Sequence, residues 1–210
     1  FLTYNTEASL SVTNHSGITG LAEARAISIH GRATGTAAAY GLHQVIDSLE
    51  GSASLHNDGD IRGDAHAMAD GESDELAVAV AFGQAVSLDG TSDSLLTIDV
   101  VNDSGGSITA LARAQADGSA RAGAAGTQYS SFFSIDGTIT NSGLIEGRAI
   151  AVAESGTATA QGIVEESNGA NNTDLTNSGI VRAYAEGHSA QATGIAIVSY
   201  LLLQSALPQS

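Results

Sequence analysis

Five segments of this chain share one alternating pattern of small apolar and polar residues, and each pattern follows an asparagine. An apolar residue stands two positions before the asparagine. After it come isoleucine or valine and then glycine or alanine at every second position. A period of two predicts a β-strand with one small apolar face and one polar face. The five asparagines recur every 36 to 45 residues and are Asn14, Asn57, Asn102, Asn141 and Asn177.

A second alternating run follows the first in each segment, after a turn that contains glycine. Each repeat therefore predicts a short strand ending in asparagine, a long alanine-rich strand, a turn and a second alanine-rich strand. Alanine has a low intrinsic preference for strands, so these runs need a tertiary reason to be extended. Close stacking of identical positions supplies that reason, and repetition at this period is typical of solenoid proteins.

These patterns predict one all-β domain over residues 1–210, a parallel β-helix of about five long rungs with a narrow interior rich in alanine and glycine. The asparagines share the parity of the inward apolar residues, so their amides should stack in a ladder along the axis. One long, flattened rung per repeat is preferred over two coils of which only one carries an asparagine. The expected rungs are residues 10–52, 53–94, 95–135, 136–172 and 173–200, and residues 201–210 either cap the last rung or begin another.

Composition and charge narrow the choice of partners. The net charge is −16, from 23 acidic and 7 basic residues, and such a surface repels nucleic acid and anionic membranes. Aromatic residues are few and scattered, at 4% of the chain, and there is no cysteine to form a disulfide or a thiolate metal site. The longest late apolar run, Ile195 to Leu203, is too short to cross a bilayer, so no membrane insertion of this segment is expected.

Three copies of the asparagine motif resemble the β-helical passenger regions of bacterial autotransporters and of adhesins like filamentous haemagglutinin. They are Val12-Thr13-Asn14, Ile139-Thr140-Asn141-Ser142-Gly143 and Leu175-Thr176-Asn177-Ser178-Gly179-Ile180. The resemblance covers most of residues 10–200. It implies a right-handed coil, a secreted or cell-surface location and a role in adhesion, aggregation or display. The repeats are longer here than is common in that family, and the interior alanines are smaller than its usual valine, isoleucine and leucine.

Two acidic turns are candidate calcium sites, because Ca²⁺ prefers hard oxygen ligands such as carboxylates. One set is Asp58, Asp60 and Asp64, and the other is Asp70, Glu72 and Asp74. Neither set matches a full twelve-residue calcium loop, so solvated loops are the simpler interpretation. Ca²⁺ is the one candidate cofactor.

The remaining motifs indicate structure more than chemistry. Arg62-Gly63-Asp64 matches the tripeptide that integrins recognise, but Gly63 belongs to the inward row of small residues, which places the tripeptide on a strand. Stacking should bring Glu146 near Arg182 or Arg113 of a neighbouring rung, as an ordinary pair across rungs. The six histidines form no spaced metal set, and no nucleotide loop, zinc motif or nucleophile elbow occurs in the sequence. We therefore expect no enzyme activity.

The sequence favours an extracellular structural or adhesive β-solenoid of a bacterial surface protein or filament. Such a protein would act through an extended repetitive surface, with a host or bacterial surface as partner. It would also associate with itself end to end, or stack on flanking rungs of a longer chain. The alternatives are a polysaccharide-active β-helix enzyme that uses paired carboxylates and a calcium-assembled surface-layer component.

Overall fold

The computed structural model describes residues 7–28, 31–71, 75–89 and 94–199, and every regular element within these ranges is a β-strand. Each repeat contributes three strands. Strands at equivalent positions of successive repeats pair in parallel, which produces three five-stranded sheets. The predicted parallel β-helix with one rung per repeat is confirmed. The predicted cap or further rung at residues 201–210 lies outside the described residues.

The three strands of a rung belong to different sheets. Sheet A contains the strands that end in asparagine: β1 (Glu7–Asn14), β4 (Glu50–Asn57), β7 (Leu95–Asn102), β10 (Ser134–Asn141) and β13 (Asn171–Asn177). Sheet B contains β2 (Gly17–Ile27), β5 (Asp60–Asp70), β8 (Ser107–Gln115), β11 (Leu144–Val152) and β14 (Ile180–Glu186). Sheet C contains β3 (Thr34–Asp47), β6 (Leu76–Asp89), β9 (Ser119–Ser131), β12 (Ser155–Ser167) and β15 (Ser189–Ser199). Rungs one, two, four and five begin slightly earlier than expected, with first strands that start at residues 7, 50, 134 and 171.

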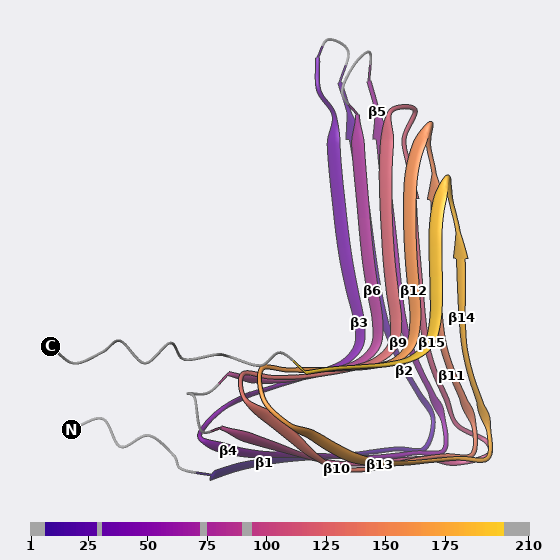
Figure 1. Cartoon of the computed structure of the whole chain (residues 1–210). Coiled ribbons are helices and arrows are strands. Elements are labelled where there is room, and N and C mark those ends of the chain that lie inside the picture. The colour runs from indigo at the N-terminus through magenta and orange to yellow at the C-terminus, as the bar shows by residue number, and fades with distance from the viewer. Residues whose placement is uncertain (1–6, 29–30, 72–74, 90–93, 200–210) are drawn as a thin grey trace, which may run out of the picture.

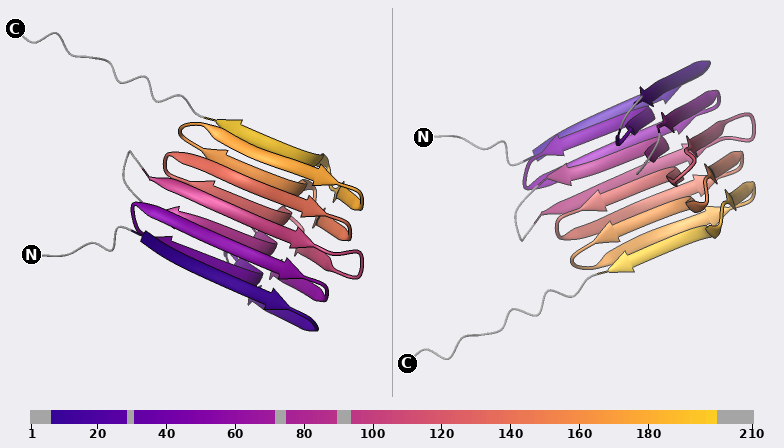
Figure 2. Two further views of the ribbon diagram at one scale, coloured as in Figure 1. Left: turned by 90° about the horizontal axis from the view of Figure 1, so that it is seen from below. Right: turned by 90° about the horizontal axis from the view of Figure 1, so that it is seen from above.

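Each rung is bent into an L (Figure 1). Sheet B and the first part of sheet C form what we call the upright arm, and sheet A and the rest of sheet C form the foot. The rungs lie side by side along the axis (Figure 2). In Figure 1 the chain runs anticlockwise, and the two views of Figure 2 show that it advances toward the viewer of Figure 1, so the coil is right-handed.

The upright arm has the predicted narrow interior, built from facing rows of alanine. Twenty alanines form one buried cluster between sheets B and C. The sheets approach so closely that a Cβ added at Gly63 would lie 2.1 Å from the carbonyl oxygen of Phe82. Alanine methyls therefore fill this interior completely, and larger side chains have no room there.

The foot has a wider interior filled by larger aliphatic side chains. Its buried cluster includes Leu55, Ile98, Ile139 and Leu88, and it continues to the first isoleucine of each central sheet B strand. The parity of these residues matches the inward apolar row before each asparagine. Two cores of different width thus lie side by side in every rung.

A column of glycines marks the bend between the two cores. Gly41 and Gly83 interrupt the pairing of β3 with β6, which skips from Tyr40 to Leu42. A Cβ added at Gly83 would lie 2.8 Å from the Cγ2 atom of Ile108. The glycines therefore leave space for the isoleucines under the bend, and the strand turns there into the foot.

The asparagines form the predicted buried ladder at the corner between sheets A and B. Four hydrogen bonds of 2.7–2.8 Å join the five side chains, each from Nδ2 of one asparagine to Oδ1 of the asparagine in the next rung. The other Nδ2 hydrogen of Asn57 is directed at the carbonyl oxygen of Ser107, at 3.3 Å. Each of the first four amides thus connects its own rung to both sheet A and sheet B of the following one.

Replacing Gly147 by alanine should test the close approach of the two alanine sheets. The new Cβ would lie 2.0 Å from the carbonyl oxygen of Gln161. Overpacking against a backbone atom should lower the free energy of unfolding by about 1–3 kcal/mol or more. Gly123→Ala is the matched control, because nothing lies within 4 Å of its Cβ position. Urea denaturation of both variants measures the effect, and equal stabilities would contradict the close approach.

Removing one amide from the middle of the ladder should cost more than removing one at its end. Asn102→Ala leaves one Nδ2 hydrogen of Asn57 and Oδ1 of Asn141 buried without partners. The expected loss is about 2–4 kcal/mol of unfolding free energy. Asn177→Ala breaks one ladder bond and one bond within its own rung at an exposed residue, so its loss should be near 1 kcal/mol. Denaturant titrations compare the two variants, and the same small loss in both would show that the ladder contributes little.

Candidate functional site

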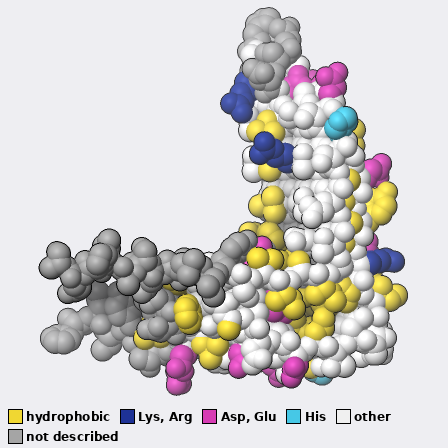
Figure 3. All heavy atoms as spheres, in the orientation of Figure 1, with side chains coloured by type: hydrophobic (Ala, Val, Ile, Leu, Met, Phe, Trp, Pro, Cys, Tyr) yellow, Lys and Arg dark blue, Asp and Glu magenta, His cyan; other side chains and the backbone are white. Residues whose placement is uncertain are grey.

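The most distinctive surface of the molecule is the outer side of sheet B, which we call the arginine face. It consists of the outward side chains of β2, β5, β8, β11 and β14. Five of the seven arginines of this acidic chain lie on these strands, whereas the strands of sheet A contain none: Arg25, Arg62, Arg113, Arg148 and Arg182. In the view of Figure 3, arginine side chains lie on both sides of the upright arm, and carboxylates lie at the top and right edge of the arm as well as under the foot.

Several of these arginines contact acidic or aromatic neighbours. Arg62 forms an ion pair with Asp64 at 2.8 Å, and this pair raises the pKa of the guanidinium. Arg182 pairs with Glu146 of the preceding rung at 2.6 Å, which confirms the predicted pairing across rungs. Arg148 lies 5.0 Å from the ring centre of Tyr184, within range of a cation–π contact. The face therefore presents both signs of charge at fixed positions.

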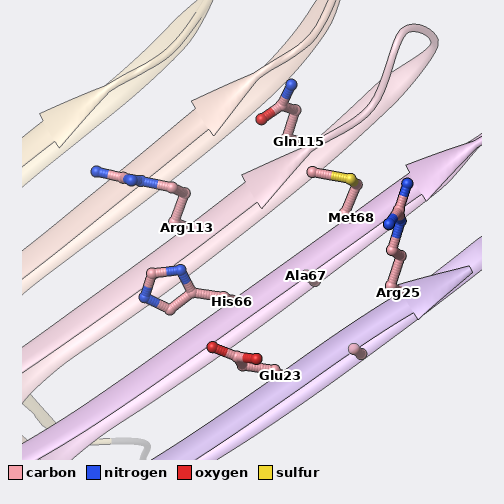
Figure 4. Close-up of a pocket in the computed structure, with 8 residues that line it drawn as sticks. Glu23, Arg25, His66, Ala67, Met68, Arg113 and Gln115 are labelled. Carbon is pink, nitrogen blue, oxygen red and sulfur yellow. The ribbon is translucent and has the colours of Figure 1, made fainter.

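Two shallow hollows lie on the arginine face. The larger, of about 390 Å³, is open to solvent and crosses β2, β5 and β8 (Figure 4). It is lined by Glu23, Arg25, His66, Met68, Arg113 and Gln115, together with two alanines. The smaller, of about 200 Å³, lies at the centre of the face over β5, β8 and β11. Open hollows on a flat sheet suit contact with a broad surface better than enclosure of a small ligand.

Large apolar side chains are also exposed on this face. Leu21 is 64% exposed, and Ile27, Met68, Val152 and Tyr184 are exposed as well. Outward positions of sheet A hold serine, threonine and carboxylates instead, as in β4 and β10. Arginine, tyrosine and methionine are enriched in protein–protein contacts. The arginine face thus has the composition of a recognition surface.

The Arg62-Gly63-Asp64 tripeptide lies on β5, as expected. Gly63 is buried against the backbone of Phe82, and Arg62 and Asp64 bind each other. The tripeptide is therefore extended and self-paired.

The first predicted calcium set is divided among separate partners. Asp58 contacts His15 at 2.9 Å, Asp60 accepts a hydrogen bond of 2.6 Å from Ser107, and Asp64 pairs with Arg62. In the second set, Glu72 and Asp74 lie outside the described residues. The part of the chain that the structure describes has no group of three histidine, aspartate or glutamate side chains placed to hold one metal ion. Calcium binding stays a prediction.

The structure stacks three aromatic rings, one of which, Phe82, is far from the other two in the sequence. Tyr40 pairs in register with Phe82, and their rings stack at 5.1 Å. The ring of His43 stacks on Tyr40 at 4.4 Å. These rings lie at the bend of sheet C. Their common position one residue before a corner glycine is the signal that would have located the Tyr40–Phe82 pair.

A buried polar cluster occupies the interior of the foot. The Tyr129 hydroxyl donates to Oε1 of Gln84 at 3.1 Å, and burial raises the pKa of this hydroxyl. Glu165 is 1% exposed, and its Oε2 has no hydrogen-bond partner among the described residues. Burial raises the pKa of the Glu165 carboxyl, while the Thr173 hydroxyl acts in the opposite direction. No pattern in the sequence indicates this cluster.

Comparison with known proteins provides no assignment. No family model, curated protein or solved structure matches the chain. Among the described elements there is no helix long and apolar enough to cross a bilayer. The function must therefore be argued from the surfaces themselves.

The raised pKa of Glu165 predicts a pH-dependent cost to stability. Because the folded state holds this proton more tightly than the unfolded state, wild-type stability should fall as the pH rises through the folded pKa. Glu165→Gln removes the charge. We expect it to raise the free energy of unfolding at pH 7.5 by about 1–3 kcal/mol, with a smaller gain at pH 5. Glu166→Gln is the control, because its side chain is only half-buried. Urea titrations at both pH values that find no gain at pH 7.5 would contradict the buried charge.

Proposed function

We propose that this chain is a structural and adhesive β-solenoid of a bacterial surface protein or filament, secreted or held at the cell surface. It acts through broad regular faces and through self-association. The resemblance of its asparagine motifs to those of autotransporter passengers and filamentous adhesins supports this location. The net charge of −16 suits a long body exposed to water.

The register of the three sheets carries the proposal. Like positions lie over like positions through all five rungs, so a further rung of the same outline can add at either end. Within the described residues, β1, β2 and β3 at one end and β13, β14 and β15 at the other are paired on one side only. Unpaired strand edges readily accept another strand. That strand would come from flanking rungs of a longer chain or from a second copy.

The asparagine ladder gives this addition a direction. Nδ2 of each of the first four asparagines donates to the following rung, and Nδ2 of Asn177 donates to the carbonyl oxygen of Gly179 in its own rung, which leaves its second hydrogen for an acceptor on an added rung. Oδ1 of Asn14, at the opposite end, is such an acceptor, and within the described residues it receives a long bond of 3.4 Å from the Ser16 amide. Head-to-tail stacking therefore continues the ladder. A contact between unlike ends does not close on itself, and its product is a filament.

Adhesion would follow from repetition. A filament presents the same faces many times, so individually weak contacts with a host or bacterial surface add up to strong attachment. The acidic surface disfavours nucleic acid as a partner.

Blocking one end should stop the growth of filaments. Ala183 of β14 and Ala24 of β2 face the interior at opposite ends of the alanine core. A carboxylate at either position would be buried under an added rung, which should weaken stacking on the order of 100-fold. Ala183→Asp and Ala24→Asp should each fail to form filaments in negative-stain images. An equimolar mixture should form end-to-end pairs but no longer stacks, because each variant keeps one competent end.

Thr176→Asp is the control, because Thr176 lies on the outer side of sheet A. This variant should form filaments like the wild type in negative-stain images. Wild-type particles that stay compact and monomeric, and that bind neither cells nor matrix, would overturn the proposal. Turnover of a polysaccharide that is lost when surface carboxylates are replaced would favour the enzyme alternative.

A further inference from the structure

Beyond stacking at its ends, the molecule has a face whose charges are arranged symmetrically about its central strand. One column of outward residues crosses the arginine face from rung one to rung five. It reads Leu21, Asp64, Leu111, Arg148 and Tyr184, and adjacent members are in register. An apolar residue lies at the centre and at both ends, and an acid and a base lie on either side of the centre.

The neighbouring column repeats this arrangement next to its centre, with the charges exchanged, whereas its two ends differ. It reads Thr19, Arg62, Thr109, Glu146 and Arg182. Here the base precedes the central strand and the acid follows it. The charged side chains on either side of β8 line the hollow of about 200 Å³ at the centre of the face: Arg62, Asp64, Glu146 and Arg148.

We propose that two copies of the chain associate face to face through the arginine face, about a two-fold axis that runs parallel to the strands over β8. This axis places β2 opposite the partner copy's β14, β5 opposite its β11, and β8 opposite β8. Asp64 then meets Arg148 of the other copy, and Arg62 meets Glu146. Leu111 meets Leu111, and Leu21 meets Tyr184. A contact of this kind uses the same patch on both copies, as in most homodimers.

The size of the face is sufficient for such a contact. Five strands at a spacing of about 4.8 Å, each about nine residues long at about 3.3 Å per residue, cover about 700 Å². Two such faces bury about 1,400 Å² in total, within the range of stable protein interfaces. Exposed Leu21 and Tyr184 at its ends, with half-buried Leu111 at its centre, add hydrophobic burial.

The occupant is a second copy because the charges of the face match themselves. Sheet A carries no arginine, so two copies meeting through that face would bring only acidic or neutral side chains together. A polyanion would meet Asp64 and Glu146 as well as the arginines. The column on the other side of Leu21 begins with Glu23 and ends with Glu186. Here the match ends, since Glu23 would lie opposite Glu186 and Arg113 opposite itself. The groove of about 390 Å³ at that position leaves room for water and counter-ions.

This inference rests on the proposed self-association, so its test must separate the two contacts. In the Ala183→Asp background end-to-end stacking is blocked, and the remaining dimer is the face-to-face one. Leu111→Asp in that background places two carboxylates together on the axis. It should raise the dimer dissociation constant at least about tenfold in sedimentation velocity. Thr97→Asp, on the outer side of sheet A, should leave the constant unchanged.

A charge exchange tests the two-fold arrangement. Asp64→Arg alone brings two bases together at each of two positions, and Arg148→Asp alone brings two acids together. Each single variant should weaken the dimer, and the double variant should recover the dissociation constant to within about threefold of its starting value. A double variant as weak as the singles would exclude this arrangement.

A cross-link gives an independent result. The chain has no cysteine, so Leu111→Cys supplies a single thiol on the axis. A bifunctional thiol reagent of about 10 Å, the spacing of two packed sheets, should join two copies at least about tenfold faster than it joins Thr97→Cys. Equal rates, or a Leu111→Asp variant with unchanged sedimentation, would overturn the face-to-face dimer. Filaments of the wild type in that case would leave the proposed function standing.

Discussion

The stacking of like on like at one strand spacing is the constraint on which this structure depends. Parallel strands lie about 4.8 Å apart, and the amide hydrogen bonds of 2.7–2.8 Å close only when neighbouring asparagines stay aligned. A slip of one residue would turn every alanine of a strand to solvent. The ladder and the alanine rows therefore enforce the same register, one through hydrogen bonds and the other through packing.

The two arms follow from the size of the side chains that this register stacks. Rows of alanine let sheets B and C approach until glycine Cβ positions meet carbonyl oxygens, as at Gly63. Rows of isoleucine and leucine hold the foot open. The glycines of the bend join the two widths and produce an L-shaped rung. An L exposes more flat sheet surface than a compact coil does, and the proposed functions use that surface.

Inward-facing and outward-facing positions differ in how much their residue types vary from rung to rung. Most inward columns hold small or aliphatic residues in every rung, whereas outward columns vary between apolar, acidic and basic residues, as Leu21, Asp64, Leu111, Arg148 and Tyr184 do. Packing restricts the first set, and solvent leaves the second free to carry recognition. Register converts that variation into a fixed pattern of charge. The candidate site is consequently a surface pattern that no single rung contains.

The sequence by itself determined the repeat, the strand order of each rung and the inward asparagines. An alternation of period two and a recurring asparagine motif such as that at Asn14 are local signals. Only the tertiary structure decided the bend, the stacking of Tyr40 on Phe82 and the burial of Glu165. Alternation loses its meaning at the bend, where Gly162, Ile163, Val164 and Glu165 are all buried in succession. The composition of the arginine face also became visible only in the tertiary structure, because its residues come from five strands that pair across rungs. The physical reason is that alternation specifies which side of a strand a residue occupies, whereas the neighbours on that side come from other rungs.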